Sequence, residues 1–442
     1  MTADDQVTTT WQQFGWGPWT DDSVVPQGPL DEQTRSVRGY PRSLTAIVGE
    51  GVVQRPVFEP ALKQYGSAMR AGEPQFVTPD VAQRWHSARR HAVDHVLAAV
   101  ATSRWAGHLV LRGSVLLQAW YGSAAREPGD LDFVVTPATW EMDEPRTERL
   151  FEAIARGADA LSRAAGDVRI DAAGAISDEI WTYDRVPGRR MILPWQADGL
   201  PSGTVQLDFV FNETLPSPPE FTDVPRWDGP TAHRILGATP EQSLAWKLLW
   251  LLSDSYPQGK DLYDAVLLAE ATPLRAQVLH ETLVAAEPHW AGHRITPGAI
   301  TAVDVDWEEF AKEYPDIATG TPEALVTRLV AALEPVFAEE VGPPVDGYVW
   351  RVRHLASHVR AGRRLAASGG MGAVLEWLQT GTVGLAEGIV IIREIVGPDR
   401  CTLEEAAAAY VNHRPFKPHD RGFYSRGPEA IERALAAIRK QV

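Results

Sequence analysis

The chain has 442 residues, of which 44% are hydrophobic and 23% are charged, a composition typical of a folded globular protein and not of a disordered one. A chain of this length is expected to form two or three domains with a sizeable core. Its formal net charge of −16 argues against non-specific binding along nucleic acids, which requires a basic field, although a local basic groove remains compatible with it.

The cysteine content and the hydropathy indicate the compartment that we expect. The single cysteine, Cys401, cannot form an intramolecular disulfide, fits a reducing environment and excludes a cysteine-rich zinc site. The N-terminal residues carry acidic side chains and lack the apolar segment of a signal peptide. No uninterrupted apolar run approaches the roughly 18–20 residues of a membrane-spanning helix. We therefore expect a cytoplasmic protein that does not associate with membranes.

The first 80 residues predict an N-terminal arm that is partly irregular. Trp11, Trp16 and Trp19 lie among Gly, Pro, Gln and Asp residues, and prolines interrupt the pattern further on. We expect these indoles to anchor the arm on the body of the protein. A helix is then predicted over residues 81–101, where apolar side chains recur at helical spacing.

Residues 109–136 combine an apolar run, a Gly113-Ser114 turn, a short helix and a strand that carries Asp130 and Asp132. Residues i and i+2 of a strand project to the same side, and two carboxylates on one face repel each other unless a cation lies between them. Oxygen ligands of this kind suit Mg²⁺ or Mn²⁺. The turn offers backbone N–H groups to an anion. The stretch therefore indicates a site for a metal ion and a phosphate group.

The rest of the chain changes from strands to helices. After a helix predicted over residues 148–165, residues 167–213 have the pattern of a β-meander, and a Pro-rich connector covers residues 216–230. Beyond it the pattern is helical, over residues 241–253, 260–269, 321–339, 349–367, 372–378, 403–411 and 428–440. We expect an α+β protein with an arm at 1–80, a catalytic domain at 81–230, a helical domain completing the active site at 231–340, and a C-terminal helical region at 341–442.

Three aspartates and the Gly-Ser turn suit the in-line transfer of a nucleotidyl group. Two divalent cations about 3.5–4 Å apart stabilise the attacking and leaving oxygens of such a reaction, so bridging carboxylates are required. Asp130 and Asp132 would bridge the metals. Asp208, a lone acid in the apolar strand VQLDFVF, would complete one metal shell and accept the proton of the attacking hydroxyl. Ser114 and the backbone of Gly113 would hold the β- and γ-phosphates.

The helical segments add further candidates for the same site. Lys247, in SLAWKLLWLL, would neutralise charge on the triphosphate, although its side chain could instead extend to solvent. Asp261 and Asp264, at i and i+3 in KDLYD, would orient Lys247 or the acceptor. Lys260 is a candidate for binding the nucleotide, and an ordinary ion pair with Asp264 on a solvated helix face is the alternative.

These residues in this order resemble the DNA polymerase β-like nucleotidyltransferase superfamily, in which Gly-Ser is followed by Asp-x-Asp and a distant third carboxylate. The combination of LVLRGSVLLQAWYG, AREPGDLDFVV, an AWK helix and KDLYD is similar to the AbiEii/AbiGii-type nucleotidyltransferase toxins of type IV toxin–antitoxin systems. The resemblance covers about residues 105–270. Relatives often carry Ser or Thr two residues before the first aspartate, where this chain has Pro128, so any role of that hydroxyl is in doubt here.

The resemblance implies a nucleotidyltransferase core with a mixed sheet, followed by a mainly helical C-terminal region. It also implies an NTP- and Mg²⁺-dependent transferase, with tRNA 3′ ends as the acceptor in some relatives, and a cognate antitoxin protein as a partner. Asp208 carries over from its strand context. The residues that carry over by motif position are Gly113, Ser114, Asp130, Asp132, Lys247, Asp261 and Asp264.

Three functions remain open at the level of sequence. The first is a toxin-like nucleotidyltransferase acting on RNA, and a run of Arg and His residues between Arg351 and Arg364 is either a solvated helix face or a surface for RNA phosphates or an acidic partner. His354 and His358 in that run lack the Glu of an HExxH zinc site. The second function modifies protein hydroxyls or a small cationic molecule such as an aminoglycoside, which the acidic net charge favours. The third is a catalytically silent binding subunit, which the retained acidic residues argue against.

Overall fold

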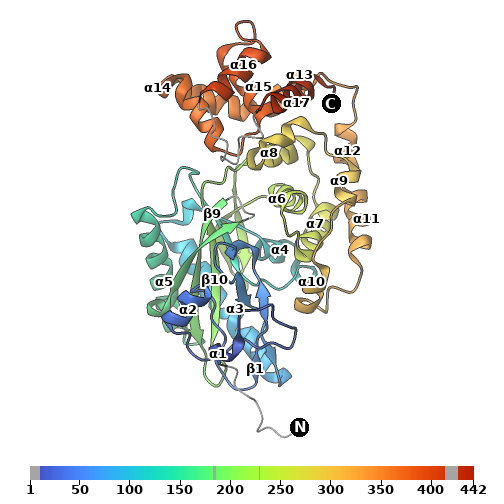
Figure 1. Cartoon of the computed structure of the whole chain (residues 1–442). Coiled ribbons are helices and arrows are strands. Elements are labelled where there is room, and N and C mark those ends of the chain that lie inside the picture. The colour runs from blue at the N-terminus through green and yellow to red at the C-terminus, as the bar shows by residue number, and fades with distance from the viewer. Residues whose placement is uncertain (1–9, 183–185, 228, 414–426) are drawn as a thin grey trace. The chain divides into compact units, whose positions relative to one another are not determined.

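The structure is a computed structural model that describes residues 10–182, 186–227, 229–413 and 427–442. The chain divides into two units, and Figure 1 labels helices of both and some strands of the first. The first unit consists of Met1–Ser243, Ser253–Leu268 and Asp304–Leu325. The second unit consists of Leu244–Leu252, Ala269–Val303 and Val326–Val442.

An eight-stranded mixed sheet lies at the centre of the first unit. Its strand order is β11-β12-β5-β6-β10-β9-β7, and β8 also pairs with β9. The pairs β6–β10 and β5–β12 are parallel, and the other pairs are antiparallel. The mixed sheet and the α+β class agree with the sequence-based prediction. The strands are β5 (Leu109–Arg112), β6 (Leu131–Val135), β7 (Arg169–Ile170), β8 (Ile176–Thr182), β9 (Val186–Gln196), β10 (Gly203–Val210), β11 (Glu220–Pro225) and β12 (Ala232–Gly237).

Helices cover one face of this sheet and leave the aspartates on the other. The Phe209 ring of β10 lies 4.7 Å from the Phe151 ring of α5 and 5.6 Å from the Phe133 ring of β6, measured between centroids. Side chains alternate along a strand, so Asp132 and Asp208 point to the opposite face. α3 packs against both α5 and the sheet. The helices of this part are α3 (Pro79–Thr102), α4 (Ser114–Tyr121) and α5 (Pro145–Ala165).

The N-terminal segment is more regular than the predicted arm. It forms two small antiparallel sheets, β1–β4 and β2–β3. Trp11 is buried against Tyr40, and Trp19 stacks on Phe14, so these two indoles pack within the N-terminal segment itself and not, as predicted, on the body of the protein. Trp16 is exposed beneath the Arg38 guanidinium, and the prediction was wrong for it. The elements are α1 (Trp11–Phe14), α2 (Glu32–Arg38), β1 (Val52–Val53), β2 (Pro56–Phe58), η1 (Pro60–Leu62), β3 (Met69–Ala71) and β4 (Gln75–Phe76).

The predicted connector at 216–230 and the residues after it form a β-hairpin instead. β11 and β12 pair along six residues each, from Glu220 opposite Gly237 to Pro225 opposite Ala232. In β11 only Val224 is buried, because β11 lies at the edge of the sheet. An edge strand of this kind lacks the apolar alternation by which strands are recognised, which explains the missed prediction.

The second unit is helical, as predicted for this part of the chain. Helix α15 was not predicted, although the apolar residues of LAEGIVIIREIV do recur at helical spacing. The predicted helix 321–339 is interrupted at Leu333, since Pro335 cannot donate the hydrogen bond that continues a helix. Its helices are α8 (Ala276–Ala286), α9 (Pro297–Thr301), α12 (Glu334–Glu340), α13 (Gly347–His354), α14 (Ala356–Thr380), α15 (Leu385–Val396), α16 (Leu403–Asn412) and α17 (Pro428–Arg439).

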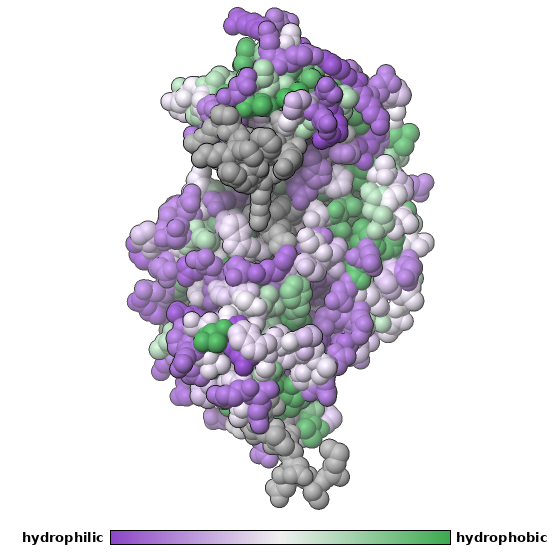
Figure 2. Space-filling view, in the orientation of Figure 1, coloured by the Kyte–Doolittle hydropathy of each residue, from purple (hydrophilic) through white to green (hydrophobic). Residues whose placement is uncertain are grey.

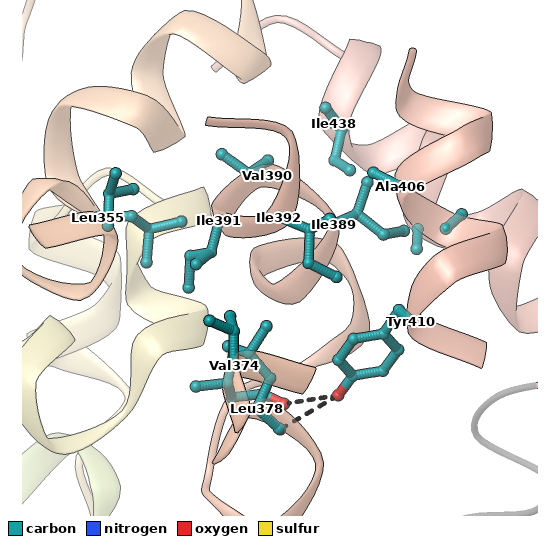
Figure 3. Close-up of a cluster of buried hydrophobic side chains, with 14 of the residues drawn as sticks. Leu355, Val374, Leu378, Ile389, Val390, Ile391, Ile392, Ala406, Tyr410 and Ile438 are labelled. Carbon is teal, nitrogen blue, oxygen red and sulfur yellow. Dashed lines mark hydrogen bonds between the residues drawn. The ribbon is translucent and has the colours of Figure 1, made fainter. Parts of the chain in front are cut away.

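Helix α15 forms the centre of the core of the second unit. Four consecutive side chains from Ile389 to Ile392 are fully buried, and Figure 3 shows them surrounded by side chains of the neighbouring helices. The Tyr410 hydroxyl donates to the backbone oxygens of Leu378 and Val383 at 3.3 and 3.4 Å. A buried aromatic side chain thus ties α16 to the end of α14.

Three helices have residues in both units, namely α6 (Pro240–Ser253), α7 (Gly259–Ala271) and α11 (Pro322–Ala332). Helix α10 (Trp307–Glu313) belongs to the first unit. None of the helices in the described part of the chain has the length and apolar character needed to cross a bilayer. On the face that Figure 2 shows, hydrophobic side chains form small patches between hydrophilic ones.

Candidate active site

A row of four charged residues crosses the centre of the sheet. The strand register places Arg112 of β5 opposite Asp132 of β6, Asp132 beside Asp208 of β10, and Asp208 opposite Arg190 of β9. Residues at the same register of neighbouring strands share a face. The two acids therefore lie side by side, with an arginine beyond each of them.

Asp130 joins these two acids from the residue that precedes the Leu131–Val135 strand. One carboxylate oxygen from each of Asp130, Asp132 and Asp208 lies within 4.8 Å of the other two. The structure therefore brings together the three residues that the sequence singled out as metal ligands. Three carboxylates at this spacing match the oxygen donor set that Mg²⁺ or Mn²⁺ prefers.

The protonation of the three acids reflects their crowding. Burial and the negative charge of Asp130 raise the pKa of Asp132 to about 7. Burial also raises the pKa of Asp208, although Arg190 acts in the opposite direction. Burial alone would raise the pKa of Asp130 as well, but the positive charge of Lys260 and of nearby arginines holds that pKa below its usual value. A cation among these acids would relieve their repulsion, so the residues present fit a divalent metal.

Arg190 holds Asp208 in a fixed orientation. Its Nε and Nη2 donate to the two carboxylate oxygens of Asp208 at 2.9 and 2.8 Å, and its side chain is buried. The Arg190 Nη1 lies 3.7 Å from Glu59 Oε2, and Arg70 contacts the same Glu59 oxygen at 3.2 Å. The sequence analysis did not identify Arg190. The signal was an arginine inside the apolar strand RRMILPWQ, since a buried charge requires a partner.

The Gly113-Ser114 turn lies against Asp132. Gly113 has φ +81°, which favours glycine, and a Cβ on it would lie 2.7 Å from Asp132 Oδ2. Ser114 is the first residue of α4, and its buried Oγ has no hydrogen-bond partner among the residues that the structure describes. A buried hydroxyl without a partner is costly. A ligand oxygen at the start of α4 would satisfy it, which fits the predicted phosphate site.

Helix α7 contributes Lys260 and two acids. Burial would lower the pKa of Lys260, but the negative charge of Asp130, and then of Asp261, holds that pKa above its usual value. Asp264 is fully buried and accepts from Arg126 Nε at 3.2 and 3.3 Å. The alternative of a Lys260–Asp264 pair on a solvated helix face is therefore wrong, because Asp264 is not at the surface. Asp261 is also buried.

Lys247 belongs to the second unit. Its side chain is buried, and its Nζ lies 4.8 Å from the centroid of the Trp250 ring. The alternative that this side chain extends into solvent is therefore wrong. Its role toward a triphosphate, and the orienting roles of Asp261 and Asp264, stay predictions.

Pro128 takes part in the loop before Asp130 through its backbone carbonyl oxygen. Arg89 Nη2 donates to the carbonyl oxygens of Pro128 and Gly129 at 3.2 and 2.9 Å, and its Nη1 donates to Glu73 at 2.8 Å. The loop that precedes Asp130 is thereby fixed by a buried arginine of α3. Arg89 itself is buried, so this helical arginine does not lie on a solvated face.

The N-terminal segment completes the surroundings of the carboxylates. A small cavity of about 110 Å³, the inner cavity, is lined by Asp130, Lys260 and Gln206 and by Glu59 and Arg70. Glu59 and Arg70 come from the β2–β3 hairpin and the residue that follows β2. The sequence assigned this segment no role in the site, because no motif marks it.

The basic run in the second unit is only partly a solvated face. Arg351 is buried and donates to the backbone oxygens of Gly347 and Ala437, both at 3.2 Å. Burial and the neighbouring His280 lower the pKa of His354 to about 4. The arginines of the run that are exposed are Arg353, Arg360, Arg363 and Arg364.

A mixed sheet with three clustered carboxylates beside a Gly-Ser turn defines a protein of the nucleotidyltransferase class. The sequence model of the family "Nucleotidyl transferase AbiEii toxin, Type IV TA system" matches residues 95–334, and the chain belongs to this family. Among solved structures, the chain is similar to MenT4, a nucleotidyltransferase toxin from Mycobacterium tuberculosis H37Rv, at 14% identity and a TM-score of 0.41. That match covers 62% of this chain and 87% of MenT4. The comparison with curated proteins found no match.

The family assignment confirms the resemblance drawn from the motifs. The match begins at residue 95, so the β2–β3 hairpin, with Glu59 and Arg70, lies outside the part of the chain that defines the family. The residues that surround the three carboxylates therefore come both from the part of the chain that the family model matches and from the segment before it.

Proposed function

We propose that the protein transfers a nucleoside monophosphate from an NTP to a hydroxyl of RNA, with tRNA as the leading acceptor, and that it acts as a toxin. The observation that carries this proposal is the cluster of Asp130, Asp132 and Asp208, whose oxygens lie within 4.8 Å of one another beside the unpartnered Ser114 Oγ. Three carboxylates are the metal ligands, and the start of α4 is the phosphate site.

In the proposed reaction, divalent cations held by the three aspartates would supply charge stabilisation at the transferred phosphoryl group. The acceptor oxygen attacks the α-phosphorus, the bond to the bridging oxygen of the β-phosphate breaks, and pyrophosphate leaves. Asp208 accepts the proton of the attacking hydroxyl, and Arg190 orients that carboxylate. The raised pKa of Asp208 suits a proton acceptor.

The remaining side chains act on the phosphates. The Gly113 backbone approaches them closely, and the Ser114 Oγ donates to a phosphate oxygen. Lys260, whose charge already interacts with Asp130, adds positive charge at the same place. Lys247 is the second lysine that we assign to the triphosphate, from the family motif.

Surface charge supports the RNA acceptor that we propose, and the family supports the protein partner. Exposed arginines of the second unit, Arg353, Arg360 and Arg364, support binding of RNA phosphates. The type IV toxin–antitoxin family supports a cognate antitoxin protein as a partner. A cytoplasmic location agrees with an RNA acceptor.

The test is a transfer assay with each of the four NTPs labelled at the α-phosphate, Mg²⁺ and total cellular RNA. We expect label on RNA with the wild-type protein and with Asp143→Asn, which changes an exposed acid away from the site, and no label with Asp130→Asn. If the wild-type protein and Asp130→Asn behave identically, the RNA proposal fails. Label that resists nuclease but not protease would identify a protein acceptor, and label that resists both would identify a small molecule.

A further inference from the structure

A second pocket lies next to the inner cavity and has a different character. This pocket, which we call the aromatic pocket, has a volume of about 350 Å³. Ligand pockets in proteins typically measure about 300–1,000 Å³, so it can hold a small planar group. The residues that line both the aromatic pocket and the inner cavity are Glu59, Arg70, Lys260, Glu313 and Tyr314.

Two half-exposed aromatic side chains form one wall of the aromatic pocket. Phe58 of β2 is 51% exposed, and Tyr256, in the loop before α7, is 45% exposed. Their ring centroids lie 5.1 Å apart at 66°. The Lys63 Nζ lies 4.7 Å from the centroid of the Tyr256 ring. Aromatic rings that touch each other and still face solvent present π-surfaces on which a further ring can stack.

The aromatic pocket shares part of its lining with the inner cavity, which Asp130 also lines. Lys260 lines the aromatic pocket and the inner cavity, and its charge interacts with Asp130, which lines the inner cavity. A nucleotide carries its phosphate and its base at opposite ends of a ribose. A base in the aromatic pocket would therefore leave its phosphate on the side of Lys260 and Asp130.

We propose that the aromatic pocket binds a planar nucleobase, stacked on Phe58 and Tyr256, and so forms the base subsite of this enzyme. The inference rests on the proposed nucleotidyl transfer. Two sources can supply the base, the donor NTP and the 3′-terminal nucleotide of the acceptor, and both offer the same stacking chemistry. Phe58 lies before the residues matched by the family, so this subsite is built partly by the N-terminal segment of this chain.

Binding measurements on the full-length protein separate the two sources. Each NTP is titrated in the presence of Ca²⁺ and compared with inorganic tripolyphosphate, which carries the phosphates without a base. Phe58→Ala and Tyr256→Ala should weaken NTP binding by about 5- to 100-fold if the donor base stacks there, since one base–aromatic stack contributes on the order of that factor. Tripolyphosphate binding should stay unchanged. If the acceptor base stacks there instead, NTP binding should stay unchanged and the KM for unfractionated tRNA should rise by a similar factor.

Controls distinguish stacking from loss of structure. Tyr256→Phe and Phe58→Tyr keep the π-surface and should bind as the wild-type protein does, and Phe221→Ala removes an equally exposed aromatic side chain from β11, outside the pocket. A wild-type protein that transfers label while both alanine variants keep wild-type NTP affinity and wild-type KM overturns the base subsite alone. A wild-type protein that binds neither NTP nor tripolyphosphate and transfers no label overturns the proposed function, and the base subsite with it.

Discussion

Metal binding at the three carboxylates should depend steeply on pH, because one of them must lose a proton first. The pKa of Asp132 is about 7 in the metal-free protein, and its usual value is 3.8. A metal ion binds the carboxylate form. The ionised fraction of Asp132 falls from about one half at pH 7 to about 0.01 at pH 5, so the apparent affinity for Mn²⁺ should fall about 50-fold over these two pH units.

The raised pKa of Asp132 also determines how the stability of the folded protein changes with pH. A carboxyl group whose pKa is raised on folding favours the folded state in its protonated form, and this contribution is lost as the pH rises from 3.8 through 7. A bound cation offsets that loss once Asp132 is ionised. The rise in Tm on adding saturating Mn²⁺ should therefore be larger at pH 8 than at pH 6.

Isothermal titration calorimetry in two buffers of different ionisation enthalpy measures the released proton directly. We expect about 0.9 proton released per Asp132 site at pH 6 and about 0.1 at pH 8. Asp132→Asn should bind Mn²⁺ weakly at both pH values and lose the pH slope, and Asp143→Asn should keep it. Equal affinity at pH 6 and pH 8, with no proton released, would refute the assignment of Asp132 as the titrating ligand.

Three substitutions test other parts of the structure. Gly113→Ala places a Cβ against the Asp132 carboxylate at a positive φ, so Mn²⁺ affinity and transfer activity should fall at least tenfold while circular dichroism stays unchanged. Asp264→Ala leaves Arg126 without its buried partner and should lower the free energy of unfolding in urea by about 3–5 kcal/mol. Tyr410→Phe removes the single hydroxyl proton that two backbone oxygens share in the core of the second unit and should cost about 1 kcal/mol in the same assay.

Matched substitutions define what would contradict these expectations. Gly107→Ala adds a Cβ into open space, and a Gly113→Ala protein that behaves like it would mean that close approach at the turn is not required. Glu270→Ala breaks the exposed pair with Arg328 and should cost less than about 1 kcal/mol. An Asp264→Ala protein as stable as that control would show that the buried pair is not structural. Unchanged unfolding of Tyr410→Phe would show that solvent replaces the lost bonds.

The residues around the three clustered carboxylates divide into those that a motif marks and those that only the fold brings near. Asp130 and Asp132 could be found because two residues of one strand share a face, and Asp208 because a lone acid interrupts an apolar strand. The sequence does not identify Asp208 as the partner of Arg190, because the register that places them opposite each other is visible only once the two strands are paired in the fold. Glu59 lies 149 positions before Asp208 and belongs to no motif.

The fold shows the same division. Amphipathic helices such as α3 and α5 were predicted within a few residues of their bounds, because one apolar face repeats at helical spacing. The edge strand β11 was missed because it has too few buried apolar residues to show an alternating pattern. Helix α15 was missed although its apolar residues recur at helical spacing, so its sequence did carry the signal.

The hairpin that supplies Glu59 and Arg70 makes the N-terminal segment part of the surroundings of the three carboxylates. Its segment is fastened to the sheet through Asp178, which accepts hydrogen bonds from the Arg42 N–H at 3.0 Å and from the Tyr65 hydroxyl at 3.1 Å. Chain termini open at a lower free energy than the core of a sheet. On warming, the catalytic rate should therefore vanish before the sheet melts, so that thermal inactivation and thermal denaturation would be two separate events in one enzyme.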